Sequence, residues 1–286
     1  MSFRGPGLPE ESAFFLSFRK GGFFAPKVRG FGKTVCWTFS ASCQSLSGKA
    51  AARMKKSVIA ALAVMVLLGG AAYASFFVAP TERTMGTVQR IFYLHMPSAI
   101  TAFAAFLVCF VANLLYVLKR EQSWDWLGVS AAEVGLAFVS VVLVTGPIWA
   151  KPVWGIWWTW DARLTSTFVL WLLYVAYLLL RSMIEDPERR ALLSAVFGIF
   201  AFLDVPLVYM SIRWWRTQHP QPVIFGGPGS GLAPAMWRVD LLSWVALMSL
   251  MALLVRYRYE LEALRGKVDA LRLVVSEREP REAEAQ

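Results

Sequence analysis

Charged residues are scarce in this sequence. They occupy 17% of its 286 positions, against roughly 25% in an ordinary soluble domain. Hydrophobic residues make up 57%, and the mean hydropathy is +0.51. This composition indicates a polytopic membrane protein rather than a soluble domain.

Cysteine and histidine are also rare. Cys36 and Cys43 lie near the N-terminus, and Cys109 lies inside an apolar stretch where a small core residue is expected. Because no C-x-x-C pair is present, the sequence predicts neither a disulfide framework nor a thiolate metal site. Only two histidines, His95 and His219, are available to bind a metal through imidazole.

The positive charge of the chain is concentrated at its beginning. Of the net charge of +10, residues 1–53 carry +6 in a segment without a long apolar run. We therefore predict no nucleic-acid partner. A transit peptide is one reading of this segment. Met54 followed by two lysines and an apolar helix is a typical start of a bacterial inner-membrane protein, so we predict that residues 1–53 form a basic leader, disordered or upstream of the true start.

Six apolar stretches are long enough to cross a bilayer, which takes about 20 residues of helix. Spanning segments must satisfy their own backbone hydrogen bonds, which excludes open sheets. The sequence therefore predicts an all-α membrane domain over residues 54–256, embedded in lipid. The predicted spans are 57–79, 98–118, 129–149, 165–184, 191–212 and 237–256.

Basic residues orient these spans. Near the ends of the spans, 12 lysines and arginines lie on the side of the two termini and of the second and fourth loops, against 7 on the side of the other three loops. The positive-inside rule then places both termini in the cytoplasm.

The segment after the last span, residues 257–286, is predicted to be a cytoplasmic amphipathic helix followed by a disordered tail from residue 277. Two heptads are too few to predict a coiled coil, so this helix is expected to lie on the membrane or on a partner subunit. Its apolar stripe consists of Leu261, Leu264, Val268, Leu271 and Val275.

Tryptophan is concentrated in one loop. Trp154, Trp157, Trp158 and Trp160 fall within seven residues between the third and fourth spans. An interfacial aromatic belt is one explanation, but a belt distributes one or two aromatic residues over each helix end. We therefore predict a flat aromatic platform for a ligand, with Asp161 and Arg163 holding it or facing a charged ligand.

The predicted orientation brings both histidines to the same face as this loop. His95 is expected in the first loop and His219 in the fifth, on the outer side of the membrane. Two imidazoles can occupy both axial positions of haem iron, and indoles can stack on the macrocycle. Arg163, Arg213 and Arg216 are candidate partners for the propionates. Zinc is less favoured because catalytic zinc sites usually have three protein ligands, and only Asp161 could add a third.

Each of these residues also has an ordinary structural explanation. His95 could cap the following helix, His219 could be a solvated loop residue, and arginines near a helix end often reach toward lipid headgroups. Asp204 lies within a predicted span and is a functional candidate because intramembrane acids are costly. Glu133 is expected to be solvated or hydrogen-bonded.

These motifs carry a resemblance. Residues 154–165, W-G-I-W-W-T-W-D-A-R-L-T, resemble the tryptophan-rich signature of the haem-handling proteins of cytochrome c maturation. The neighbouring motifs resemble the CcmC branch of that superfamily, over about residues 54–256. Ala150 replaces a usual glycine and Asp204 an expected asparagine. The neighbouring motifs are Q-R-I-F-Y-L-H-M-P at 89–97, T-G-P-I-W-A-K-P at 145–152 and V-P-L-V-Y-M-S-I-R-W-W-R-T-Q-H at 205–219.

The resemblance implies a function. Haem b would be bound non-covalently at the periplasmic face of the inner membrane, with His95 and His219 as axial ligands and the tryptophan loop against the ring. It would be delivered to the haem chaperone CcmE, with CcmD and the ABC transporter pair CcmA and CcmB as further partners. No enzymatic activity is expected of this chain.

Other classes remain as alternatives. A membrane cytochrome b needs four or more histidines on helices, which this chain lacks. A cytochrome c synthetase of the related CcsA type is expected to carry an additional intramembrane histidine pair. A non-haem permease with an aromatic belt is the remaining alternative.

Overall fold

The computed structural model describes residues 31–220 and 231–276, and every regular element in this part of the chain is a helix. The chain divides into two units, Met1–Ser57 and Val58–Gln286. Six helical stretches are long and apolar enough to cross a membrane, so the predicted all-α, six-span fold is confirmed. These spans are Ala52–Val78, Thr87–Lys119, Gln122–Trp154, Ala162–Met183, Pro187–Trp214 and Pro234–Arg272.

Local sequence signals explain where several helices begin and end. The side chain of Asp161 accepts a hydrogen bond at the start of α5, and Asp186 does the same at the start of α6. Gly155 ends α4 in the left-handed conformation, with φ of 79°. The helices are α2 (Phe31–Tyr73), η2 (Ala74–Val78), η3 (Thr87–Ile91), α3 (Phe92–Lys119), α4 (Gln122–Trp154), α5 (Ala162–Met183), α6 (Pro187–Phe202), α7 (Asp204–Trp214) and α8 (Pro234–Ser276).

The predicted leader and tail are only partly described. Helix α2 begins at Phe31, ahead of Met54, whereas residues 1–30 lie outside the described residues. The disorder predicted for residues 277–286 also falls outside them. Helix α8 continues as one helix to Ser276, and the residues of its apolar stripe are exposed.

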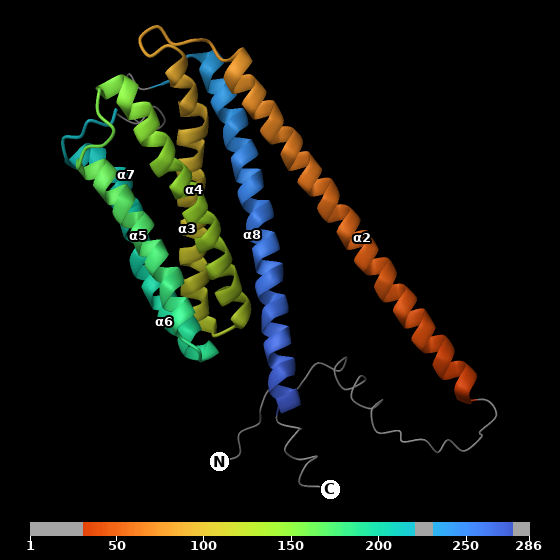
Figure 1. Ribbon diagram of the computed structural model, residues 1–286. Coiled ribbons are helices and arrows are strands. Elements are labelled where there is room, and N and C mark those ends of the chain that lie inside the picture. Colours follow the sequence, from red (N-terminus) through yellow and green to blue (C-terminus); the bar gives the residue numbers. More distant parts are fainter. Residues whose placement is uncertain (1–30, 221–230, 277–286) are drawn as a thin grey trace. The chain divides into compact units, whose positions relative to one another are not determined.

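Helices α3 and α4 make the most extensive contact in the bundle and lie between α5 and α8 (Figure 1). Helix α3 packs against α4, α6 and α8, and α5 packs against α4, α6 and α7 (Figure 1). The rings of Phe106 and Tyr174 stack between α3 and α5 with centroids 3.6 Å apart. Apolar side chains from every helix from α3 to α8 contribute to the core around this pair.

A polar side chain is wedged between glycines in this core. The fully buried amide of Asn113 on α3 lies between Gly128 on α4 and Gly198 on α6. A Cβ atom at Gly128 would lie 2.7 Å from Oδ1 of Asn113, and one at Gly198 would lie 2.2 Å from its Nδ2. The two glycines therefore let three helices approach closely, as small residues do in membrane bundles.

The fifth predicted span is not a single helix. It contains α6 and α7, which are separated by a turn at Leu203. Pro206 has no N–H to bond to the carbonyl of Phe202, and this interrupts the helical ladder. The interpretation of 191–212 as one continuous helix is therefore wrong at this point. Asp204 lies in the first turn of α7, and its Oδ2 is buried with no hydrogen-bond partner in the described part of the chain.

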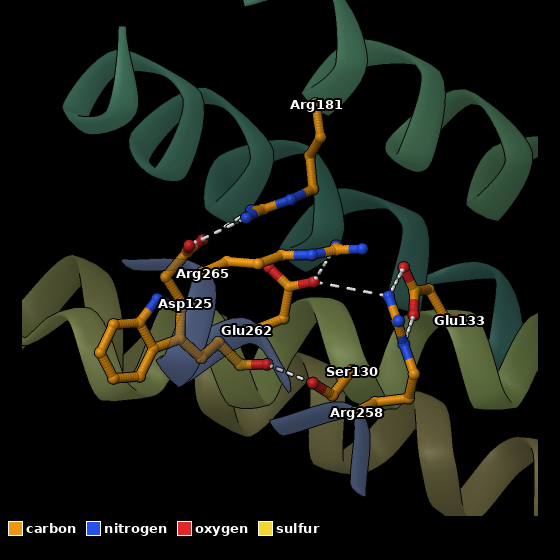
Figure 2. Close-up of polar contacts among 8 residues, drawn as sticks. Asp125, Ser130, Glu133, Arg181, Arg258, Glu262 and Arg265 are labelled. Atoms are coloured by element: carbon orange, nitrogen blue, oxygen red, sulfur yellow. Dashed lines mark hydrogen bonds and ion pairs between the residues drawn. The ribbon is translucent and has the colours of Figure 1, made fainter. Parts of the chain in front are cut away.

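Ion pairs join α4, α5 and α8 at the end of the bundle that is predicted to be cytoplasmic (Figure 2). Arg181 makes two hydrogen bonds of 2.5 and 2.9 Å to the carboxylate of Asp125, and both side chains are nearly buried. Arg258 on α8 binds Glu133 on α4 through two nitrogens. It also contacts Glu262, which accepts a hydrogen bond of 2.7 Å from Arg265. Glu133 is thus hydrogen-bonded, as expected.

Candidate functional site

His95 lies within a helix. It is in the first turns of α3, so the loop position predicted for it is wrong. Its Nδ1 is 2.9 Å from Oγ1 of Thr145 on α4. The hydroxyl of Thr145 donates its one hydrogen to the carbonyl of Val141 at 2.7 Å. Thr145 must therefore accept from His95, which places the ring proton on Nδ1 and leaves the Nε2 lone pair available to bind a metal.

His219 presents the same nitrogen. Its Nδ1 is 2.9 Å from the carbonyl oxygen of Pro220, and a carbonyl can only accept. Burial and, to a smaller extent, the charge of Arg163 lower the pKa of His219 to about 4. The ring is therefore neutral at pH 7, with the proton on Nδ1 and the lone pair on Nε2, which is the form that binds metals.

Asp161 connects the tryptophan loop to the segment that carries His219. Its Oδ1 accepts from the backbone N–H of Leu164 at 2.9 Å, which caps α5. Its Oδ2 accepts from the backbone N–H of Gln218 at 3.0 Å and from the hydroxyl of Thr159 at 3.3 Å. Both carboxylate oxygens of Asp161 are therefore used to hold protein groups, although the two segments are 57 residues apart.

Arg163 makes a second connection on the same side. Its Nη1 donates to the backbone carbonyl of Val208 on α7 at 2.7 Å. The guanidinium also lies within electrostatic range of both imidazoles, and His95 lies within electrostatic range of His219. The structure thus brings His95, His219, Asp161 and Arg163 together from three different segments of the chain.

The four tryptophans do not form one flat surface. Trp154 ends α4 and meets Trp149 edge to face, with an interplanar angle of 84°. Trp158 and Trp160 meet at 76°, and both contact the edge of Phe168 on α5. The predicted flat platform is therefore wrong in its geometry. Trp157 and Trp160 are 57% and 74% exposed, so the loop still presents large apolar rings.

Two rings of this loop line an apolar groove of about 430 Å³. Trp158 and Trp160 line it together with Trp171 on α5, whose indole N–H donates to the hydroxyl of Ser140 at 2.9 Å. The indole N–H of Trp158 is buried and has no hydrogen-bond partner among the residues that are described. A polar ligand atom could satisfy this group. The groove is lined by Ser140, Leu143, Val144, Pro147, Trp158, Trp160, Phe168 and Trp171.

The segment between α7 and His219 is exposed and rich in aromatic and basic residues. Trp214 and Trp215 are 59% and 50% exposed and meet at 80°. The guanidinium of Arg213 lies 5.0 Å from the centre of the Tyr209 ring, and Arg216 is exposed. Both arginines are near the histidine segment, but nothing in their geometry assigns them to a propionate.

The donors present fit haem better than zinc. Residues 31–220 and 231–276 contain no group of three His, Cys, Asp or Glu side chains that could hold a metal ion. Two imidazoles whose Nδ1 atoms are engaged could supply both axial ligands of a haem iron through Nε2. Exposed indoles nearby supply apolar surface for a macrocycle.

Sequence comparison gives an independent result. A family model described as Heme exporter protein C (CcmC) matches residues 38–274. The chain belongs to the Heme exporter protein C family. The relative of that name from Bradyrhizobium diazoefficiens is 31% identical over 218 residues, which cover 76% of this chain and 82% of the relative.

Other members of the Heme exporter protein C family are similar over large parts of the chain. The one from Rhodobacter capsulatus is 31% identical over 215 residues, covering 73% of this chain and 87% of its own length. The one from Escherichia coli K12 is 33% identical over 161 residues, or 56% and 65% respectively. The resemblance seen in the sequence motifs is thus confirmed, and with the six apolar helices it identifies a multi-pass membrane protein of this family.

The sequence does not predict the contacts that Thr145 and Gln218 make in the site. Thr145 lies in a motif of the family resemblance, but its bond to His95 joins residues 50 positions apart. The backbone N–H of Gln218 is bound by Asp161 across a similar separation. No local spacing in the sequence marks either contact.

Proposed function

We propose that this chain binds haem through Nε2 of His95 and Nε2 of His219, one on each side of the iron, and delivers it to the haem chaperone CcmE. Membership of the family assigns the chain to haem handling in cytochrome c biogenesis. The proposal that the two histidines bind the iron rests on which nitrogen of each imidazole carries the proton. Each has its Nδ1 engaged by an oxygen acceptor, and each thereby offers Nε2 to a metal.

The tryptophan loop supplies the apolar part of the proposed site. Trp157 and Trp160 are the most exposed rings of the loop and would contact the macrocycle. Trp154 packs against Trp149, and Trp158 packs against Trp160. Trp154 and Trp158 would therefore hold the loop in place. Asp161 and Arg163 act on protein groups, since they fasten α5 to the segment of His219 and to α7. Arg213 and Arg216 remain candidates for the propionates.

The proposed activity is binding and transfer, not a chemical conversion by this chain. The bound species would be haem b, held non-covalently. The partners would be CcmE, CcmD and the transporter pair CcmA and CcmB of the haem export system. The site would face the periplasm and both termini the cytoplasm, because the basic residues favour the opposite face from His95 and His219.

Absorption spectroscopy of the detergent-purified protein tests this proposal. We expect low-spin haem bands in the native protein, and weakened or shifted bands in both His95→Ala and His219→Ala. Met183→Leu is a suitable control, because Met183 is 80% exposed at the far end of α5. A protein that stays colourless after haem is supplied would overturn the proposal.

A second measurement separates transfer from covalent chemistry. Haem b that is held only by its ligands and by packing is extracted by acidified acetone, whereas covalently attached haem stays with the protein. We expect complete extraction from this chain. Haem that remains attached to the chain, or thioether formation on an apocytochrome by the purified chain alone, would favour the synthetase alternative.

A further inference from the structure

Thr145 contacts both its own helix and a histidine on a neighbouring helix. Like Thr101 and Thr167, it donates to a backbone carbonyl four residues earlier on its own helix, at 2.7 to 2.8 Å in the three cases. That bond is an ordinary feature of helical threonines. Thr145 differs because its oxygen also receives a hydrogen bond from His95 at 2.9 Å, across the contact between α3 and α4.

The direction of this bond is fixed. A hydroxyl has one hydrogen, and that of Thr145 points to the carbonyl of Val141. Its oxygen is then an acceptor, and its acceptor strength is increased because the same hydroxyl is donating. His95 must therefore carry its proton on Nδ1.

The backbone beside Thr145 keeps the ring in place. A Cβ atom at Gly146 would lie 3.4 Å from Cε1 of His95, so the imidazole rests against the backbone of α4. The imidazole of His95 thus contacts α4 at two atoms: Nδ1 bonds to the hydroxyl of Thr145, and Cε1 lies against the backbone at Gly146. No side chain at position 146 competes for this space.

We propose that Thr145 is the positioning residue of His95: it fixes the tautomer and orientation that present Nε2 to iron, and it strengthens the imidazole as a donor. This inference rests on the proposed function, because it requires that Nε2 bind iron. Metal-binding histidines are commonly held by such a partner on the other nitrogen, and its loss typically lowers metal affinity 10–100-fold.

Loss of the hydroxyl has a measurable consequence beyond weaker binding. Without an acceptor at Nδ1, the imidazole donates less electron density, and the ferric iron loses more than the ferrous iron. A tenfold loss confined to the ferric state raises the one-electron reduction potential by about 59 mV. A purely structural role of Thr145 would not raise the potential in this way.

The experiment uses the full chain loaded with haem. Thr145→Val removes the hydroxyl and keeps the branched shape, whereas Thr145→Ser keeps the hydroxyl and removes a methyl group. We expect the potential of Thr145→Val, measured by spectroelectrochemical titration, to rise and its retention of haem on a desalting column to fall. Thr145→Ser should stay close to the native protein in both measurements.

The outcomes separate this inference from the proposed function. If the native protein binds no haem, the proposed function fails. If it binds haem and Thr145→Val has the native potential and retention, only the role of Thr145 is overturned. Equal changes in the valine and serine variants would assign Thr145 to packing and overturn it as well. If Thr145→Val does not fold, Thr145→Ala provides the same loss of the hydroxyl, compared with serine in the same way.

Discussion

Substitution of Asp161 should loosen the segment that carries His219. In the native protein Asp161 accepts from the backbone N–H groups of Leu164 and Gln218, at 2.9 and 3.0 Å. Loss of a helix cap costs about 0.5–2 kcal/mol, and a hydrogen bond to a charged acceptor contributes roughly 1.5–3 kcal/mol. Asp161→Ala removes both, so we expect a lower melting temperature together with a local effect at Gln218.

The local effect distinguishes anchoring from capping. If the bond to Asp161 holds the backbone at Gln218, its loss should speed hydrogen–deuterium exchange there roughly tenfold to a hundredfold, since about 1.4 kcal/mol corresponds to a factor of ten. Mass spectrometry of peptides that contain Gln218 measures this rate. Asp161→Asn separates the two roles, because asparagine also caps helices well but has one acceptor oxygen, whereas the native carboxylate uses two.

We expect Asp161→Asn to keep most of the native stability, because its oxygen can still cap α5. Exchange at Gln218 should be faster than in the native protein, because the NH2 group that replaces Oδ2 cannot accept from the backbone N–H of Gln218. Unchanged exchange at Gln218 in Asp161→Ala would refute the reasoning, because it would mean that other contacts hold the segment. A lower melting temperature without faster exchange at Gln218 would mean that Asp161 acts only as the cap of α5.

Three further predictions concern the bundle and the pH response. Gly198→Ala should lower the melting temperature, because its Cβ would lie 2.2 Å from Nδ2 of Asn113 and overpacking costs about 1–3 kcal/mol. Arg181→Ala should destabilise the protein by about 3–5 kcal/mol, because it leaves the buried carboxylate of Asp125 unpaired. Burial in the folded protein holds the pKa of His219 at about 4, below the ordinary value of 6.5 for a free histidine. The stability that depends on a neutral His219 is therefore present above pH 6.5 and is lost as pH falls toward 4.

Each of these has a control and a contrary outcome. Gly69 has open space around its Cβ position, so Gly69→Ala should not lower the melting temperature, and an equal loss in both glycine variants would contradict the packing argument. Replacing Arg181 and Asp125 together by apolar residues should be less damaging than Arg181→Ala alone. For the pH response, His219→Ala should lose less stability than the native protein between pH 7 and pH 5 in thermal melts. An identical pH response would contradict the buried, neutral ring.

The sequence predicts the spans well because the bilayer imposes their length and polarity. It fails where a single residue changes a helix locally. Pro206 divides the fifth span, and this effect is not visible in hydropathy. Helix α3 is preceded by η3 and begins at Phe92, six residues before the predicted span, because polar residues near a helix end do not stop the helix. Hydropathy alone therefore predicts a loop at His95, which lies on a helix.

The site could be predicted in its residues but not in its connections. The rarity of histidine and the density of tryptophan direct attention to His95, His219 and the loop at 154–160. Their hydrogen-bond partners in the protein come from segments that are distant in the sequence. The bond of His95 to Thr145 and the use of both oxygens of Asp161 by the backbone could not be read from spacing.

The turn at Leu203 has a consequence for the two histidines. His95 belongs to α3, a helix that runs unbroken to Lys119, whereas His219 follows α7, which is only 11 residues long. The interruption before α7 removes a helical hydrogen bond at the start of that short helix. A change in the separation of the two imidazoles by tilting of α7 would therefore require loss of the hydrogen bonds from Arg163 to Val208 and from Gln218 to Asp161.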